Sequence, residues 1–233
     1  MIIFAQHKYI KTSTINYTNT LKDTFKHQGL RKQLISLLKE KGIIDLNVLK
    51  AMNKVPRHLF LDSSFEAHAY QNKAFPIGAD QTISHPFTVA FQSELLQLKD
   101  NHTVLEIGTG CGYQTAVLLE MGAKVFSIER QQELFKKTKL FLPKLGYRAK
   151  QLIFGDGYKG LPEYAPFDSI IVTAGAPYVP NPLLSQLKIG GRLVIPIGSD
   201  PQTMHLYVRT SATEFKKETF GEFRFVPMLE DKN

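Results

Sequence analysis

The stretch "VLEIGTGCGYQ", residues 104–114, places three alternating glycines directly after an apolar run that ends in an acid, Glu106. Glycine adopts backbone conformations that other residues avoid, and it lets another group approach the backbone closely. The apolar residues 103–107 predict a short buried strand, and residues 113–122 predict the helix that follows it. A strand, a glycine-rich turn and a helix in this order indicate a ligand site at the carboxyl end of a parallel strand.

Strands and helices alternate in the rest of the C-terminal part. Apolar runs predict strands at 124–129, 149–157, 167–174 and 192–198, with helices at 131–146 and 180–191. Such alternation is typical of a parallel sheet that is covered on both faces. The last two predicted strands, 204–210 and 215–228, have no helix between them and should pair as an antiparallel hairpin. The predicted fold is an α/β, doubly wound, Rossmann-like sheet with a C-terminal antiparallel hairpin.

The N-terminal part has a different character. Residues 1–28 are polar and show no clear period, so we expect a loosely ordered extension. Residues 29–233 are expected to form a single domain, with a helical part at 29–100. Apolar residues at helical spacing predict three helices in that part, at 30–41, from Asp45 onward and over 86–98. A loop-rich stretch, 61–86, precedes the third helix.

Composition favours an ordinary intracellular protein. The chain has 233 residues, a formal net charge of +8 and one cysteine, Cys111, so an internal disulfide is excluded. No run of five or six basic residues accompanies the charge, which favours a solubilising role over a nucleic-acid or membrane surface. No apolar run approaches the roughly 20 residues of a membrane helix, and the start is too weakly apolar for a secretory signal. We expect a cytoplasmic protein without membrane or nucleic-acid partners.

Two common ligands of glycine-rich loops do not match this one. A phosphate loop needs Lys and Ser or Thr after its last glycine, whereas Tyr113 and Gln114 follow here. The dinucleotide frame needs a third small residue where this chain has Tyr113 or Thr115. Glu106 would also repel a pyrophosphate. A ligand with a sugar, a positive charge and no phosphate fits better, and S-adenosylmethionine has these properties.

Acids end three consecutive predicted strands. Glu129 lies about 20 residues beyond the loop, where an acid can accept hydrogen bonds from ribose hydroxyls. Asp156 is placed to bind the adenine amino group, with Gly157 allowing close approach. Each acid alone is also explained as a cap of a turn or helix, but the set indicates S-adenosylmethionine. The predicted cofactor-binding residues of this region are Glu106, Gly108, Thr109, Gly110, Glu129, Asp156 and Gly157.

The residues alone leave the methyl acceptor open. Enzymes that methylate amino groups of DNA carry Asn or Asp before Pro-Pro-Tyr/Phe after the fourth strand. The corresponding stretch here is "VTAGAPY", residues 172–178, without such an acid or amide. No cluster of His and acids accompanies it, so no metal is expected. RNA or a small molecule remains an alternative acceptor, and a cofactor-binding protein without turnover remains an alternative function.

Six segments carry a more specific resemblance: "VPRHLF" (55–60), "AFPIGADQTISHP" (74–86), "VLEIGTGCGYQ" (104–114), "GDGYKGLPEYAPFD" (155–168), "LLSQLKIGGRLVIPIG" (183–198) and "FRFVPM" (223–228). They resemble the bacterial protein-L-isoaspartate O-methyltransferases from about Leu30 to Met228. The resemblance implies a methyltransferase sheet with a reversed last strand. It also implies transfer of a methyl group to the free α-carboxylate of L-isoaspartyl residues of damaged proteins, with D-aspartyl residues as a second acceptor to test and S-adenosyl-L-homocysteine as product.

The resemblance also assigns the acceptor site. Ser84 matches the position of the catalytic hydroxyl, and its alternative role is to cap the helix that follows. Gln81, Thr82 and Ile83 match the loop over the cofactor. The residues expected beside the acceptor are Ile83, Ser84, Ala174, Ala176 and Pro177. Because an acceptor carboxylate is already ionised at neutral pH, no general base is needed. The expected partners are isoaspartyl-containing peptides and proteins, bound by a monomer.

Two departures from the family pattern concern the same site. Gly175 stands where the relatives usually have alanine, so backbone contacts with the acceptor are expected to shift. Leu229 follows the "VPM" segment where a polar residue is common, so a hydroxyl contact to the cofactor is lost.

Overall fold

The computed structural model of the chain describes residues 22–231, so most of the extension predicted over 1–28 lies outside the described residues. The first helix, α1 (Phe25–Glu40), begins earlier than the leucine spacing indicated. Thr24 accounts for this start, because its hydroxyl accepts a hydrogen bond from the backbone of His27 while the His27 ring accepts one from the backbone of Thr24. Helix α1 therefore begins inside the predicted extension.

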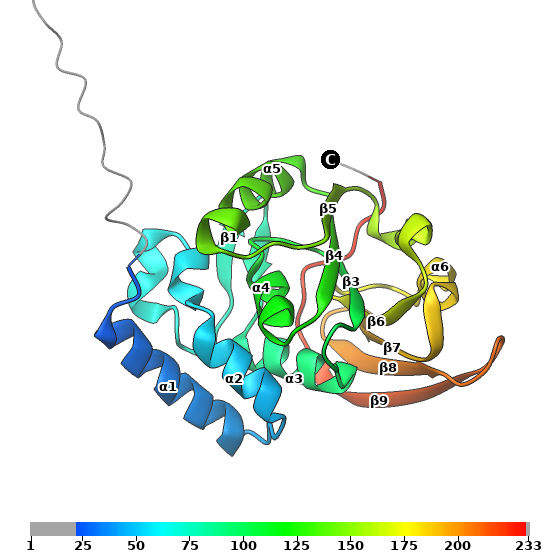
Figure 1. Ribbon diagram of the computed structural model, residues 1–233, viewed down its shortest axis with the longest axis horizontal. Helices are drawn as coiled ribbons and strands as arrows, with labels where there is room; N and C mark the ends of the chain where they lie inside the picture. The colour runs from blue at the N-terminus through cyan, green and yellow to red at the C-terminus, as the bar shows by residue number, and fades with distance from the viewer. Residues whose placement is uncertain (1–21, 232–233) are drawn as a thin grey trace, which may run out of the picture.

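A seven-stranded sheet forms the centre of the molecule, in the order β5-β4-β3-β6-β7-β8-β9 (Figure 1). Its strands are β3 (Thr103–Ile107), β4 (Lys124–Glu129), β5 (Gln151–Phe154), β6 (Phe167–Val172), β7 (Leu187–Ile197), β8 (Gln202–Arg209) and β9 (Phe215–Phe223). Strands β5, β4, β3, β6 and β7 pair in parallel. Because the chain moves from β3 to β4 on one side and later to β6 on the other, a crevice forms at their carboxyl ends. The doubly wound α/β prediction is confirmed.

The C-terminal strands confirm the predicted hairpin and correct one detail. Strands β8 and β9 pair antiparallel, and β7 and β8 do so too. Two successive reversals return β9 to the direction of β7. The strand that runs against the sheet is therefore β8, and the expectation of a reversed last strand is wrong.

Helices and short 3₁₀ turns surround the sheet. The α-helices are α1, α2 (Leu46–Lys54), α3 (Pro86–Leu96), α4 (Tyr113–Glu120), α5 (Gln132–Phe141) and α6 (Asn181–Ser185). The 3₁₀ turns are η2 (Arg57–Phe60), η3 (Ser63–His68), η4 (Leu142–Leu145), η5 (Gly157–Lys159) and η6 (Pro162–Tyr164).

The helix predicted over 180–191 is too long. Helix α6 ends at Ser185, and the residues from Leu187 onward belong to β7. Leu187 pairs with Phe167 of β6, and both side chains are fully buried. Pairing with the sheet prevails here because the segment ends in two glycines, which are poor helix formers.

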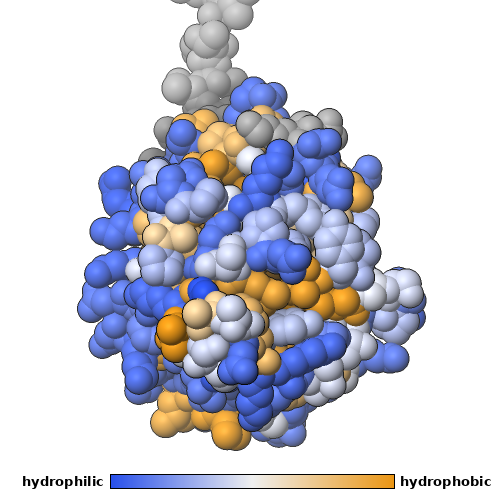
Figure 2. Space-filling model, turned by 90° about the vertical axis from the view of Figure 1, so that its right-hand side faces the viewer, coloured by the Kyte–Doolittle hydropathy of each residue, from blue (hydrophilic) through white to orange (hydrophobic). Residues whose placement is uncertain are grey.

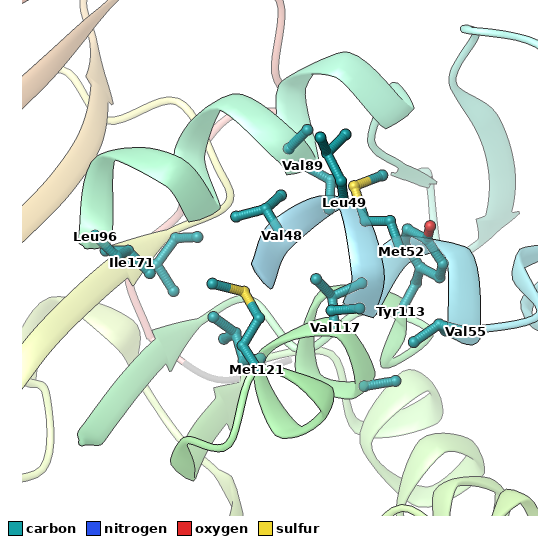
Figure 3. Close-up of a cluster of buried hydrophobic side chains, with 14 of the residues drawn as sticks. Val48, Leu49, Met52, Val55, Val89, Leu96, Tyr113, Val117, Met121 and Ile171 are labelled. Atoms are coloured by element: carbon teal, nitrogen blue, oxygen red, sulfur yellow. The ribbon is translucent and has the colours of Figure 1, made fainter. Parts of the chain in front are cut away.

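Apolar side chains fill both faces of the sheet. Val104 and Leu105, neighbours on β3, are both fully buried but belong to two separate hydrophobic clusters. Successive strand residues point to opposite faces, so both faces are covered. Figure 3 shows the first cluster, in which Val48 and Met52 of α2 lie between Val89 of α3 and the residues of α4. This packing fixes the helical N-terminal part against the helix that follows the glycine loop.

A small hairpin lies in the stretch predicted to be loop-rich. Strands β1 (Phe75–Gly78) and β2 (Gln81–Ile83) pair antiparallel around the two residues Ala79 and Asp80. Both turn residues have positive φ, 49° and 53°. Turns with two left-handed residues suit the twist of a hairpin but usually contain glycine or asparagine. The sequence lacks that signal at the first position, so the hairpin was not predicted.

The surface is largely hydrophilic on the face shown in Figure 2, with a band of apolar residues across it. Among residues 22–231, no helix is both long enough and apolar enough to cross a membrane.

Candidate cofactor and acceptor site

A cavity with about 630 Å³ of empty space lies at the carboxyl ends of β3, β4 and β6. The hairpin β1–β2 and the C-terminal segment after β9 form its other walls. The predicted residues that line it are Gln81, Thr82, Gly108, Gly110, Glu129, Gly157 and Ala174. The structure therefore brings together residues from segments that are far apart in the chain.

The glycine loop is shaped first by the protein itself. Gly108 has a φ of +94°, and a Cβ atom there would lie 2.5 Å from Oγ1 of Thr173. The Thr173 hydroxyl donates a hydrogen bond to the carbonyl of Gly108, at 2.8 Å. A Cβ atom on Gly157 would likewise overlap the side chain of Ile107. Contacts within the protein therefore require glycine at both positions, whether or not a ligand is bound.

Glu129 holds the loop from the end of β4. Its Oε2 accepts a hydrogen bond from the backbone of Gly110, and its Oε1 accepts one from the backbone of Gln131, both at 2.8 Å. Burial raises the pKa of Glu129, while these backbone donors oppose the rise. A carboxylate has about four acceptor sites. Because Glu129 also lines the cavity, its remaining acceptor capacity fits a ligand with hydroxyl groups.

Glu106 lies beneath the loop rather than in the cavity. Its carboxyl group is fully buried, and Oε2 accepts hydrogen bonds from the hydroxyls of Thr115, at 2.5 Å, and Ser127, at 2.7 Å. The Ser127 hydroxyl also contacts that of Thr109, at 2.6 Å, which joins this network to the loop. Burial raises the pKa of Glu106 to about 7. Hydroxyl groups hold Oε2, whereas Oε1 has no hydrogen-bond partner among the described residues, and contact with a positively charged cofactor stays a prediction.

Asp156 caps the turn η5. Its Oδ1 accepts a hydrogen bond from the backbone of Tyr158, at 2.9 Å, and Lys159 lies 3.6 Å from Oδ2. Gly157, the next residue, lines the cavity. The alternative role as a cap is therefore present, and contact with an adenine amino group stays a prediction.

Ser84 lies between β2 and α3, beside the cofactor cavity. In the described part of the chain, the N-cap of α3 is His85, and no side chain caps that helix end. Ser84 instead lines a small neighbouring cavity together with Thr82, Ile83 and the glycine loop. Its carbonyl accepts a hydrogen bond from the guanidinium of Arg57, at 2.8 Å. The structure does not support the capping role and places Ser84 in a small cavity that shares Thr82, Gly108 and Gly110 with the cofactor cavity.

Arg57 is a site residue that the sequence analysis missed. Its fully buried guanidinium donates hydrogen bonds to the carbonyls of Ala69, Lys73 and Ser84 and lies 4.8 Å from the ring centre of Tyr113. Burial lowers the pKa of Arg57. Arg57 therefore joins the segment after β2, at Ser84, to Tyr113, the first residue of α4. An arginine after the proline of "VPRHLF" gives no spacing signal that would have revealed this role.

The predicted acceptor residues take different positions. Pro177 lines a second, open cavity that shares Thr82 with the cofactor cavity. Ala174 lines the cofactor cavity itself. Ala176 is fully buried, and its backbone N–H donates to the carbonyl of Pro196 at 2.9 Å. Ala176 therefore supports this edge by backbone pairing, whereas Pro177 and Ala174 face open space.

Gly175 anchors the C-terminal segment. Its N–H donates to the carbonyl of Val226, at 2.8 Å, and its carbonyl accepts from the N–H of Met228, at 2.7 Å. A Cβ atom on Gly175 would lie 2.7 Å from the side-chain amide carbon of Gln202, which explains glycine where alanine was expected. Residues 226–229 thereby become a wall of the cofactor cavity. The family resemblance placed this segment near the cofactor, but its pairing with Gly175 was not expected from the sequence.

One group of possible metal ligands occurs elsewhere among the described residues. Oxygen and nitrogen atoms of Asp23, His27 and His58 lie within 4.8 Å of one another. These side chains already have protein partners, namely Arg31 for Asp23, Glu66 for His27 and Tyr70 for His58. The cluster is explained by packing and hydrogen bonding between α1 and η2.

Known proteins match this chain over most of its length. The family model of protein-L-isoaspartate(D-aspartate) O-methyltransferase (PCMT) matches residues 29–233. A protein-L-isoaspartate O-methyltransferase of Christiangramia forsetii is 70% identical over 213 residues, which cover 91% of this chain and 100% of the relative. A protein of the same name from Salinibacter ruber is 46% identical over 225 residues, which cover 92% and 97%.

Two solved structures support the same assignment. One protein-L-isoaspartate O-methyltransferase has a TM-score of 0.77 and 32% identity, and the match covers 84% of this chain and 65% of that chain. A beta-aspartate methyltransferase from Plasmodium falciparum, in complex with S-adenosyl-L-homocysteine, has a TM-score of 0.76 and 25% identity, with coverage of 86% and 99%. The family match and the similarity of sequence and fold agree: this chain belongs to the protein-L-isoaspartate(D-aspartate) O-methyltransferase family.

Proposed function

We propose that the protein transfers a methyl group from S-adenosylmethionine to the free α-carboxylate of L-isoaspartyl residues in damaged proteins. One observation carries the proposal: Thr82 lines the cofactor cavity, the small cavity of Ser84 and the open cavity of Pro177. A cofactor and a protein chain bound in these cavities would meet beside Ser84. Membership of the family supports this acceptor.

The cavity residues fit the cofactor. Glu129 offers acceptor capacity for the ribose hydroxyls, and Gly157 leaves room for the adenine ring. We also assign contacts to the loop residues Gly108, Thr109 and Gly110, to Asp156, and to Gln81, Thr82 and Ile83. Glu106 acts beneath them, by fixing the loop through Thr115 and Ser127. The bound cofactor supplies a methyl group on a positively charged sulfur atom.

Catalysis requires positioning more than proton transfer. The acceptor carboxylate has a pKa of about 4 and is ionised at neutral pH, so its oxygen takes the methyl group directly. The sulfur keeps the electron pair of the broken bond and becomes neutral, and no proton moves. We assign the Ser84 hydroxyl to donate a hydrogen bond to the carboxylate and to align it. Arg57 is the positioning residue behind it, because it holds the Ser84 carbonyl.

The proposal extends to the setting of the enzyme. We infer a cytoplasmic monomer that acts on peptides and proteins and not on nucleic acid. The single cysteine and the absence of a basic run in the sequence support this inference. D-Aspartyl residues, which the family name includes, are a second acceptor to be tested.

Methyl transfer to a matched pair of peptides tests the proposal. The peptides differ only in isoaspartyl against aspartyl linkage, and transfer is followed with labelled S-adenosylmethionine. We expect transfer to the isoaspartyl peptide only. Ser84→Ala should lower kcat/KM by about tenfold or more, the scale on which loss of a positioning contact acts. The affinity of the Ser84→Ala variant for S-adenosyl-L-homocysteine, measured by calorimetry, should be close to that of the unchanged protein.

Ser185→Ala is the matched control, because the Ser185 hydroxyl bonds the carbonyl of Pro182 on α6, away from the site. It should behave as the unchanged protein. Cofactor binding without transfer to either peptide would contradict the proposed acceptor. Transfer to RNA or to a small molecule would then identify the alternative enzyme, and no transfer to any acceptor would favour a binding protein.

A further inference from the structure

Four phenylalanines form an aromatic cluster between α3 and β9. The ring centres of Phe91 and Phe223 lie 5.2 Å apart, and those of Phe87 and Phe91 lie 5.8 Å apart. Phe220 meets Phe91 edge to face at 5.6 Å. All four side chains are only partly buried. The cluster therefore joins the helix to the last strand and still leaves aromatic surface open to solvent.

Three of these rings line an open groove. Phe87, Phe91 and Phe223 form its apolar wall, and its empty space is about 1150 Å³. Phe220 does not line it. Partly exposed aromatic rings gain further stabilisation when another apolar group covers them. We call this surface the aromatic groove.

The aromatic groove adjoins the open acceptor cavity. His85 and Arg224 line both spaces. An extended chain advances roughly 3.3–3.6 Å per residue, so three residues span about 10 Å. Because His85, the residue after Ser84, lines the groove, a peptide that places its isoaspartyl residue beside Ser84 runs next to the groove.

The charged residues of the aromatic groove do not favour a ligand of either charge. Arg224 and Glu222, one basic and one acidic residue, both line the groove and are both exposed. The nearby Arg224 also lies 3.6 Å from Asp200. With opposite charges on the rim and phenylalanine rings on the wall, the chemistry favours an apolar ring over a charged side chain.

We propose that the aromatic groove binds an aromatic side chain within three residues of the isoaspartyl residue, in the same substrate chain. This inference rests on the proposed function and adds a sequence preference to it. The occupant is a residue of the damaged protein, held by the walls of Phe87, Phe91 and Phe223 while the isoaspartyl carboxylate lies beside Ser84.

A set of isoaspartyl peptides tests the preference. The parent peptide has alanine at all three positions on each side of the isoaspartyl residue, and each variant has phenylalanine at one of them. We expect one or two adjacent positions, on one side only, to lower KM by about fivefold to tenfold, as partial burial of an aromatic side chain implies. This decrease in KM should be absent in the Phe223→Ser variant.

Phe220→Ser is the matched control, because Phe220 belongs to the same cluster and strand but does not line the groove. It should keep the preference for phenylalanine and report any general loss of stability. Equal KM values for all peptides, or a preference that survives in Phe223→Ser, would overturn the inference. If the alanine parent itself accepts no methyl group, the proposed function fails instead, so the two failures are distinguishable.

Discussion

The glycine loop and the acceptor segment lie side by side, yet they are held in different ways. In the loop, the backbone N–H groups of Gly108 and Thr109 both donate to the carbonyl of Ile128, and the Thr138 hydroxyl donates to the carbonyl of Gly110 at 2.6 Å. The acceptor segment 81–84 has an exposed Thr82 and depends on a hairpin turn at one end.

At the other end, the guanidinium of Arg57 fixes the carbonyl of Ser84. The cofactor side is therefore held by many short contacts in the loop, whereas the acceptor side depends on strand pairing with β1, the burial of Ile83 and the hydrogen bond from Arg57. This difference suits the proposed reaction. A cofactor has one shape and benefits from a preorganised site, whereas damaged proteins present many sequences and need an open segment.

The largest effect is expected from Gly108→Ala. The new methyl group would lie 2.5 Å from the Thr173 hydroxyl, and φ is +94°. Overpacking costs about 1–3 kcal/mol, and a left-handed non-glycine residue costs about 1–2 kcal/mol. We expect a loss of about 3 kcal/mol in the free energy of unfolding, measured in urea, and loss of binding of S-adenosyl-L-homocysteine.

Gly146→Ala separates the two causes, since Gly146 also has a positive φ, +84°, but a Cβ atom added there would meet nothing within 4 Å. It should lose only about 1 kcal/mol and keep cofactor affinity. Equal losses in the two variants would show that backbone strain, and not the contact with Thr173, requires glycine in the loop.

The next effect is the pH dependence caused by Glu106. Burial raises its pKa from 4.5 to about 7 in the folded protein. Between these values the unfolded chain is ionised while the folded protein keeps the proton, so folding stability falls as pH rises. A pKa unit corresponds to about 1.4 kcal/mol, which gives about 3 kcal/mol in total. The contribution is fully present below pH 4.5 and lost above pH 7.

Glu106→Gln should remove this dependence. Unfolding in urea at pH 5 and pH 8 is the measurement, and the variant should gain stability relative to the unchanged protein at the higher pH. Glu163→Gln, at an exposed acid, is the control for a simple change of charge. Parallel pH profiles for all three proteins would mean that Glu106 is ionised under the loop.

Arg57→Lys tests the attachment of the acceptor segment. A lysine cannot reach the three carbonyls that Arg57 bonds, so the Ser84 carbonyl loses its donor. We expect a stability loss of about 2 kcal/mol, as for an unsatisfied buried group. We also expect kcat/KM for an isoaspartyl peptide to fall about tenfold, with cofactor affinity nearly unchanged.

Arg31→Lys is the control, because Arg31 is also buried and bonds Asp23 and the carbonyl of Asn53, away from Ser84. It should lose similar stability and keep methyl transfer. If both variants lose transfer to the same degree, the acceptor segment depends on general stability and not on the Arg57 attachment.

The sequence predicted the regularly patterned parts of the molecule. Strands 103–107 and 124–129 were predicted with their observed ends, because buried strands next to glycine turns have a clear apolar signal. The glycine loop and Glu129 were also found, since their spacing follows from the strand and helix around them. Helix α6 was overestimated, because strand pairing by Leu187 depends on a distant partner.

Contacts between distant segments were not predictable in this way. Arg57 acts through carbonyl groups, which every residue possesses, so its identity alone gives no partner. The burial of Glu106 depends on Thr115 and Ser127, two hydroxyls on different elements. The wall formed by residues 226–229 depends on pairing with Gly175. Periodicity describes an element, whereas these features arise only after the elements are packed.

The smallest effect on stability is expected at the turn of the hairpin β1–β2, which leads into the acceptor segment. Asp80 has a φ of +53°, which costs about 1 kcal/mol for a residue with a side chain. Asp80→Gly removes that cost but adds backbone freedom to the unfolded chain, so we expect a net gain of about 0.5 kcal/mol, read as a rise of about 1–2 °C in the thermal midpoint. Asp80→Ala keeps the strain and should show no gain. If glycine also fails to stabilise the protein, the turn is not under strain, and the acceptor segment is held by its pairing with β1 and by Arg57.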